Sequence, residues 1–104
     1  MTSTLRQMEI VRGKILYYLK LIYPQPATLP LLQGELDIFG YPLPIEDLEF
    51  HAAYLAEKGL INLENMHGAQ ARRCVALAKI TAKGIDYFDG RLPADEGIYL
   101  EPEP

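Results

Sequence analysis

The nine residues AYLAEKGLI, from Ala53 to Ile61, contain the feature that decides the fold. A helical pattern runs into Lys58 and Gly59, and glycine is the residue that most often ends a helix in the left-handed conformation. The apolar pair that begins at Leu60 follows at once and favours a strand. The stretch therefore predicts a helix that turns through one glycine directly into a strand.

Downstream of this stretch the pattern changes to a hairpin and then back to a helix. Residues 60–64 and 73–81 are predicted to be antiparallel strands, joined by a long glycine-containing loop over residues 65–72. Thr81 is placed to cap a short last helix over residues 82–88. The predicted order after the glycine is therefore strand, strand, helix.

Upstream of the stretch three helices are predicted. Residues 4–23 have apolar side chains at three- and four-residue steps, which is typical of one buried helix face, and prolines end the pattern. Thr28 is a suitable N-cap for a second helix that ends before Gly40. Pro44 suits the first position of the third helix, which runs to Lys58.

The order three helices, hairpin and short helix resembles the winged helix-turn-helix superfamily. The resemblance depends on Gly59-Leu60-Ile61, where the third helix meets the first wing strand, and on the run ITAKGIDYF at residues 80–88, where the second strand meets a threonine-capped helix. It implies an α+β, mostly α fold with a three-helix core, a two-stranded β-hairpin wing, and a short C-terminal helix and tail. We predict a winged helix-turn-helix domain over residues 1–90 and an acidic, proline-rich C-terminal tail over residues 91–104.

Composition places limits on the class of protein. The chain has 104 residues, 49% hydrophobic and 23% charged, with a mean hydropathy of -0.03, as expected for one soluble domain. It has no apolar run long enough for a membrane span and no signal-peptide pattern, so we expect a cytoplasmic protein without membrane contact. Cys74 is the only cysteine and there are two histidines, so neither a metal site nor a cofactor is expected.

Catalytic motifs are not recognisable either. Neither histidine has a nucleophile or an acid at motif spacing, and the chain lacks a phosphate-binding glycine loop, so an enzymatic role is not expected. His51 is predicted to be a half-buried polar residue and Cys74 a small apolar one.

Charge is distributed in blocks. Residues 1–34 have four bases and one acid, and residues 35–64 have one base and seven acids. Residues 65–91 have five bases and two acids, whereas residues 92–104 have four acids and no base. The middle of the chain is therefore strongly acidic, and the predicted wing is basic.

The resemblance implies a dimeric DNA-binding transcriptional regulator, in which the third helix enters the major groove and the wing lies along the backbone. In the predicted wing, His67, Arg72 and Arg73 are suited to contacts with phosphates. The alternative is that the two arginines only keep an exposed hairpin soluble.

The predicted outer face of the third helix has the wrong chemistry for a groove. It consists of three carboxylates and two aromatic side chains: Glu46, Asp47, Phe50, Tyr54 and Glu57. Carboxylates repel phosphates, and none of the five is a residue that commonly reads a base edge. A second hypothesis is therefore a winged-helix module that binds protein through this face and not DNA. Packing of Phe50 and Tyr54 within the chain, or stacking on bases, remains open.

Two further features concern partners. Ile10, Tyr17 and Leu21 lie opposite the core stripe of the first helix and predict a homodimer contact. The segment after residue 91 is rich in proline and acid, so we expect a frayed tail. The alternative is that its apolar triplet, residues 98–100, docks on this or a neighbouring subunit and covers the outward stripe of the first helix.

Overall fold

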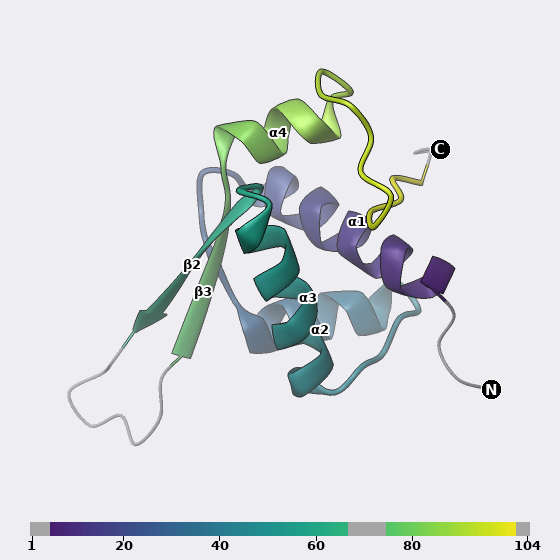
Figure 1. Cartoon of the computed structure of the whole chain (residues 1–104). Coiled ribbons are helices and arrows are strands. Elements are labelled where there is room, and N and C mark those ends of the chain that lie inside the picture. The colour runs from purple at the N-terminus through teal and green to yellow at the C-terminus, as the bar shows by residue number, and fades with distance from the viewer. Residues whose placement is uncertain (1–4, 67–74, 102–104) are drawn as a thin grey trace.

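Four helices and three strands follow one another along residues 5–66 and 75–101, which are the residues described in the computed structural model (Figure 1). They are α1 (Leu5–Ile22), β1 (Ala27–Thr28), α2 (Leu29–Ile38), α3 (Ile45–Glu57), β2 (Ile61–Met66), β3 (Val75–Ile80) and α4 (Ala82–Phe88). The predicted fold class, α+β and mostly α, is confirmed. None of the described helices is long and apolar enough to cross a membrane.

Local chemistry sets the ends of the helices. The Thr28 hydroxyl accepts a hydrogen bond from the Leu31 amide at 3.2 Å, so it caps α2 as predicted. Thr81 caps α4 in the same way. Gly40 and Gly59 have φ values of +96° and +78°, the left-handed region that glycine adopts at little cost, and they follow the C-caps of α2 and α3.

The sheet contains one more strand than the sequence predicts. Its order is β1-β3-β2 and both pairings are antiparallel, with Leu63 opposite Ala78 in the hairpin and Ala27 also opposite Ala78 from the other side. The predicted two-stranded hairpin is present as β2 and β3, and β1 adds a third strand that the sequence did not predict. Two residues are too few to produce an alternating pattern, so β1 could not be recognised before its pairing with β3 was known.

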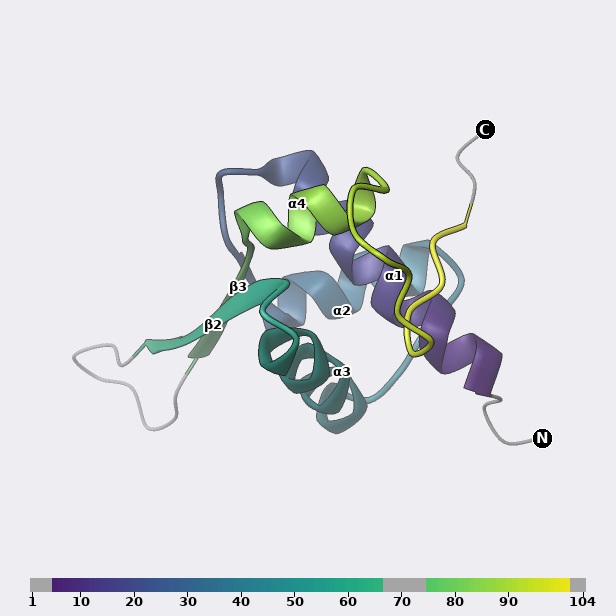
Figure 2. The same cartoon turned by 45° about the horizontal axis from the view of Figure 1, so that its top comes forward.

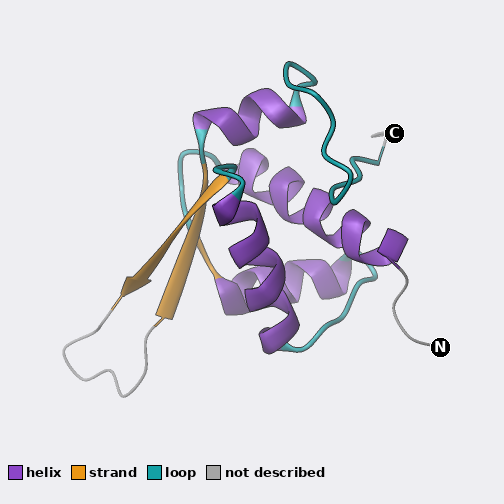
Figure 3. Ribbon diagram, viewed as in Figure 1, coloured by secondary structure: helices purple, strands orange, loops and turns teal. Residues whose placement is uncertain are grey.

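The core lies between the helices and the inner face of the sheet. Nine large side chains are almost fully buried: Ile15, Leu16, Leu19, Leu32, Leu36, Leu48, Leu55, Ile61 and Ile80. They come from α1, α2, α3, β2 and β3, and α1 alone provides three of them. The hairpin extends away from this helical body (Figure 3).

The tail returns to the helices after α4 and lies along the N-terminal half of α1 in both views (Figures 1 and 2). Ile98 is only 6% exposed and belongs to the core cluster. The expectation of a frayed tail is therefore wrong for residues 91–101. Composition suggested fraying because the segment has few apolar residues, but a helical surface that is already formed supplies the partners that it lacks by itself.

Candidate nucleic-acid interface

The outer face of α3 is exposed along most of its length. Glu46, Asp47, Phe50 and Glu57 are exposed as predicted, and Phe50 retains 58% of its accessible surface. Glu49 is exposed as well and was missed, although the acidic block that contains it was evident. Because Glu46 and Asp47 occupy the first turn of α3, they also interact favourably with the positive end of the helix dipole.

No base offsets these carboxylates within the helix-turn-helix unit. Residues 21–57, which form β1, α2 and α3, have no Lys or Arg. They have six acids: Glu35, Asp37, Glu46, Asp47, Glu49 and Glu57. Affinity for a nucleic acid comes largely from Lys and Arg at phosphates, so this surface repels a groove instead of binding it.

Tyr54 does not belong to the exposed face, which corrects its predicted position. Its hydroxyl donates a 2.7 Å hydrogen bond to the Oδ1 atom of Asp95, and the Arg12 guanidinium lies 3.9 Å from its ring centroid. The tail covers this end of α3. A helical wheel could not reveal this, because Asp95 is 41 residues away along the chain.

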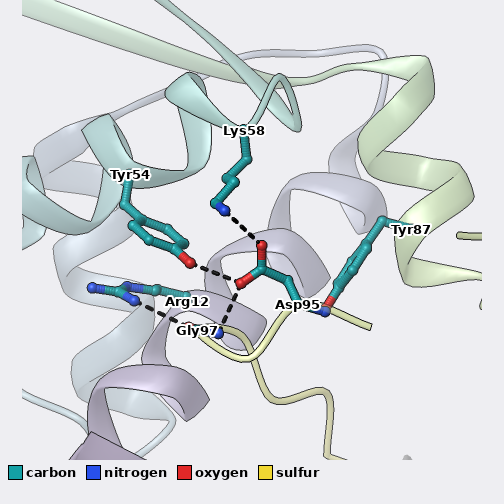
Figure 4. Close-up of polar contacts among 6 residues, drawn as sticks. All are labelled: Arg12, Tyr54, Lys58, Tyr87, Asp95 and Gly97. Carbon is teal, nitrogen blue, oxygen red and sulfur yellow. Dashed lines mark hydrogen bonds and ion pairs between the residues drawn. The ribbon is translucent and has the colours of Figure 1, made fainter. Parts of the chain in front are cut away.

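Asp95 is the centre of the contacts that hold the tail (Figure 4). Its carboxylate accepts hydrogen bonds from Tyr54 and from the Gly97 amide, and it forms a 3.0 Å ion pair with Lys58. Its own amide donates to the Tyr87 hydroxyl at 2.9 Å. The carboxylate thus connects the tail with α3, and its amide connects the tail with α4.

These contacts shift the acidity of the groups around the carboxylate. Burial by itself would raise the pKa of Asp95, but the hydrogen bonds from Tyr54, Gly97 and Lys58 outweigh burial and hold the pKa below its ordinary value. The pKa of Tyr54 is raised, first by burial and then by its bond to Asp95. Asp95 is therefore an anion when it accepts these bonds.

Arg12 connects the tail with the buried part of α3. It is only 7% exposed, and its Nε atom donates a 3.1 Å hydrogen bond to the Nδ1 atom of His51. Its Nη1 atom donates a 3.1 Å bond to the carbonyl oxygen of Gly97. His51 itself is 5% exposed, so it is buried and not half-buried as predicted. The burial of Arg12 could not be predicted from the sequence, because arginine is rarely buried.

Because Nδ1 of His51 accepts a bond, the neutral ring is favoured. Burial first, and the Arg12 charge second, lower the pKa of His51 below 6.5, while Asp47 acts in the opposite direction. On acidification, His51 of the unfolded chain therefore binds a proton near pH 6.5, whereas His51 of the folded chain binds it only at a lower pH. The stabilising contribution is present above pH 6.5 and is lost as the pH falls through the lower, folded value.

We accordingly expect the free energy of unfolding to decrease on acidification from pH 7.5 to pH 5.5, by at most about 1.4 kcal/mol per pH unit from this residue. The control is His51→Asn, whose side-chain oxygen can accept from Arg12 but does not titrate. Urea unfolding of both proteins at each pH isolates the contribution of His51, because all other groups are shared. Parallel pH profiles would refute the assignment.

All three predicted wing contacts, His67, Arg72 and Arg73, lie outside the described residues, and so does Cys74. The described part of the hairpin has one base, Lys79 on β3, which is exposed and lies opposite Asn62 of β2.

The predicted dimer stripe of α1 is only partly open. Ile10 and Tyr17 are half-buried, whereas Leu21 is 62% exposed. The Tyr17 ring lies between those of Phe39 and Phe88, with centroids 6.1 and 6.0 Å away. The tail does not reach Tyr17 or Leu21 through any described contact; it covers the neighbouring face of α1 at Gly13 instead. Leu21 and the three rings thus form a partly exposed apolar row across α1, α2 and α4.

Metal binding has no support in the described residues, because residues 5–66 and 75–101 contain no group of three or more His, Cys, Asp and Glu side chains that could hold an ion.

Comparison with known proteins identifies solved structures with the same fold. No protein-family model matches the chain, and no curated protein matches it. Among solved structures, a PadR-like transcription factor from Bacteroides fragilis is similar with a TM-score of 0.61 and 19% identity, over 76% of this chain and 77% of that one. A PadR-family transcriptional regulator from Eggerthella lenta is similar with a TM-score of 0.60 and 20% identity, over 77% and 70%.

A third structure, of a proposed transcriptional regulator from Thermoplasma acidophilum, has a TM-score of 0.61 and 22% identity, over 77% of this chain and 78% of that one. These structures share the architecture of this chain at low sequence identity. The resemblance to winged helix-turn-helix proteins is confirmed at the level of the fold.

Proposed function

We propose that this winged helix is a non-enzymatic transcriptional regulator that contacts DNA with its hairpin and not with the outer face of α3. The observation that carries the proposal is the charge distribution on the fold. The helix-turn-helix unit, residues 21–57, has six acids and no base, whereas the hairpin has Lys79 on β3 and, in its sequence, Arg72 and Arg73. The similarity to PadR-like regulators supports a regulatory role.

Salt-dependent binding to mixed genomic DNA fragments tests the proposal directly. A few phosphate contacts from the hairpin predict weak binding whose affinity falls with salt along a shallow slope. Absence of binding at low salt would refute it.

The same arrangement predicts that the acids on α3 weaken DNA binding. In a winged helix α3 lies beside the hairpin, so a DNA duplex on the hairpin brings phosphates near Glu46, Asp47 and Glu57. Replacing them together, as Glu46→Gln, Asp47→Asn and Glu57→Gln, should raise DNA affinity by about 2- to 10-fold at low salt, because three screened repulsions are removed.

Fluorescence anisotropy with a labelled duplex measures this change. The matched control is Glu96→Gln, which removes an exposed carboxylate on the tail, far from α3 in sequence and not part of its outer face. An unchanged affinity in the triple variant would show that α3 stays away from DNA.

A second candidate function is a protein-binding module that uses this face of α3. The observation that favours it is Phe50, whose 58% exposure on an acidic helix face suits a protein contact better than a groove. In that case the triple variant should leave DNA binding unchanged and weaken the protein partner.

We also propose that the chain is a homodimer through the apolar row at α1. An exposed leucine beside three half-buried aromatic rings is the kind of surface that a second copy covers. Leu21 is the most exposed member of the row, and it is therefore the best residue with which to test the dimer.

Leu21→Glu should weaken the dimer by at least about tenfold, because a carboxylate would be desolvated at an apolar contact. Light scattering at micromolar concentration should give about twice the 11.7 kDa chain mass for the wild type and a lower mass for the variant. Leu5→Glu is the matched control, since Leu5 is 76% exposed on the same helix and is not part of the row. A wild-type chain that stays monomeric contradicts the proposal.

A further inference from the structure

Residues 95–101, here called the tail segment, lie against a surface that two distant parts of the chain build. This surface, here called the tail seat, consists of four side chains, one glycine and one backbone carbonyl from α1, α3 and the α3 C-cap: Glu9 (carbonyl), Arg12, Gly13, Lys14, Tyr54 and Lys58. Figure 4 shows the part of the seat around Asp95. None of these residues is a neighbour of the tail segment in sequence, so the seat is formed by the folded helices.

The seat recognises the main chain of the tail segment at two points. The amide of Tyr99 donates a 3.0 Å hydrogen bond to the carbonyl oxygen of Glu9. The carbonyl oxygen of Gly97 accepts the 3.1 Å bond from Arg12. The main chain of the segment thus donates one bond to the seat and accepts one from it, and the segment itself turns at residues 95–98, where the Ile98 amide donates a 3.1 Å bond to the carbonyl oxygen of Asp95.

Side chains of the tail segment add specificity. Ile98 is buried in the core cluster, and Asp95 receives the Tyr54 hydroxyl and the Lys58 ammonium. At the other end Glu101 pairs with Lys14 at 3.0 Å. The seat thus contributes positive charges to a segment that carries acids at both ends, with one apolar anchor between them.

Two glycines make the fit close, one on each side of the contact. A Cβ at Gly13 of α1 would overlap the carbonyl oxygen of Tyr99, and its nearest neighbours all belong to the tail segment. A Cβ at Gly97 would overlap the hydroxyl of Tyr54 and would also lie 3.0 Å from Arg12. A larger residue at position 13 therefore blocks the seat and leaves the tail segment unchanged. A larger residue at position 97 prevents the tail segment from fitting and leaves the seat unchanged.

We propose that the tail seat is a peptide-binding site for an acidic segment with a turn at its start, and that it accepts the tail segment of a second copy of this chain as well as its own. The second copy is the occupant because its residues 95–101 can form every contact that the chain's own tail segment forms: the two main-chain bonds, the apolar anchor and both ion pairs. None of these contacts depends on the covalent connection through residues 89–94. The site is separate from the hairpin and from α3's outer face, so the proposal does not depend on DNA binding.

The decisive experiment mixes two complementary variants of the full chain. The Gly97→Val variant has an empty seat and a tail segment that no longer fits a seat. The Gly13→Val variant has a blocked seat and an unaltered tail segment. Both also carry Leu21→Glu, which removes the separate dimer contact proposed above. We expect each variant alone to be monomeric by light scattering and the mixture to contain a one-to-one complex of about twice the 11.7 kDa chain mass.

A labelled synthetic peptide of residues 91–104 gives a second readout. The peptide should bind the Gly97→Val variant, whose seat is empty. It should not bind a variant that carries both Gly97→Val and Gly13→Val, whose seat is blocked. It should bind the wild type far more weakly, because the tethered segment competes at a millimolar effective concentration. A peptide with Ile98→Ala should bind about 10- to 100-fold more weakly, since the apolar anchor is lost.

Glu96→Val is the control for the added side chain, because Glu96 lies in the same segment and is exposed. It should behave as the wild type. If Gly97→Val does not fold, as judged by circular dichroism, Ile98→Ala in the full chain is the second way to empty the seat. A mixture that remains monomeric, or a peptide that does not bind a folded chain with an emptied seat, overturns the proposal.

Discussion

Replacing Arg12 with alanine should lower the free energy of unfolding by about 2–4 kcal/mol, because one buried and one partly buried acceptor would each lose a donor, at about 1–3 kcal/mol for a buried one. The acceptors are the Nδ1 atom of His51 and the carbonyl oxygen of Gly97. The ring of Tyr54 would also lose the guanidinium that lies against it. The loss should extend to the tail, since Arg12 is the residue that joins the tail to the interior of α3.

Urea unfolding measures the loss, and hydrogen exchange at the amide of Tyr99 reports the release of the tail, because that amide is bonded to Glu9. The control is Arg91→Ala. The Arg91 side chain is 69% exposed and its ion pair with Asp86 lies at the surface, so its loss should change stability little. Similar effects at both positions would mean that burial of Arg12 contributes nothing.

The second large effect concerns DNA. Replacing Arg72 and Arg73 together with alanine should weaken binding by up to about 60-fold at 0.1 M monovalent salt and should reduce the salt slope by about two phosphate contacts. The loss should be uniform across DNA sequences, because phosphate contacts carry no sequence information. Titration of labelled duplexes of different sequence at several salt concentrations measures both quantities.

A double substitution elsewhere controls for the change in net charge. Lys20→Ala with Arg91→Ala also removes two bases, but these pair with Asp89 and Asp86 on the α4 side of the molecule. This control should retain most of the affinity. If both double variants lose affinity equally, net charge and not the hairpin governs binding.

Taken together, the contacts give the molecule three separate surfaces. The hairpin is basic in sequence, the outer face of α3 is acidic with Phe50 at its centre, and the tail segment occupies the seat on α1. Two acids of the tail, Asp95 and Glu101, are paired with Lys58 and Lys14, so these two add little to the repulsion at α3. The homodimer contact at the apolar row of Leu21 involves none of these three surfaces, so the proposed contacts with DNA, through the row and with another chain's tail segment can be tested independently.

The sequence alone determined the order of the elements and most of their ends. Thr28 and Thr81 act as caps and Gly40 and Gly59 end helices because these effects are local: each needs only a hydroxyl or a missing Cβ within about one helical turn. The acidic face of α3 was also predictable, since helical periodicity places its carboxylates opposite the buried leucines.

Only the tertiary structure decided the positions of Tyr54, His51, Arg12 and the tail. Each depends on a partner far along the chain: Asp95 for Tyr54, Arg12 for His51, and Gly97 for Arg12. Amphipathic periodicity separates a buried from an exposed face, but it does not indicate when a distant segment covers part of the exposed face. The two-residue strand β1 was missed for the same reason, because its only signature is its pairing with β3. Local features such as helix caps can therefore be predicted from the sequence, whereas contacts between segments distant in sequence are known only from the folded structure.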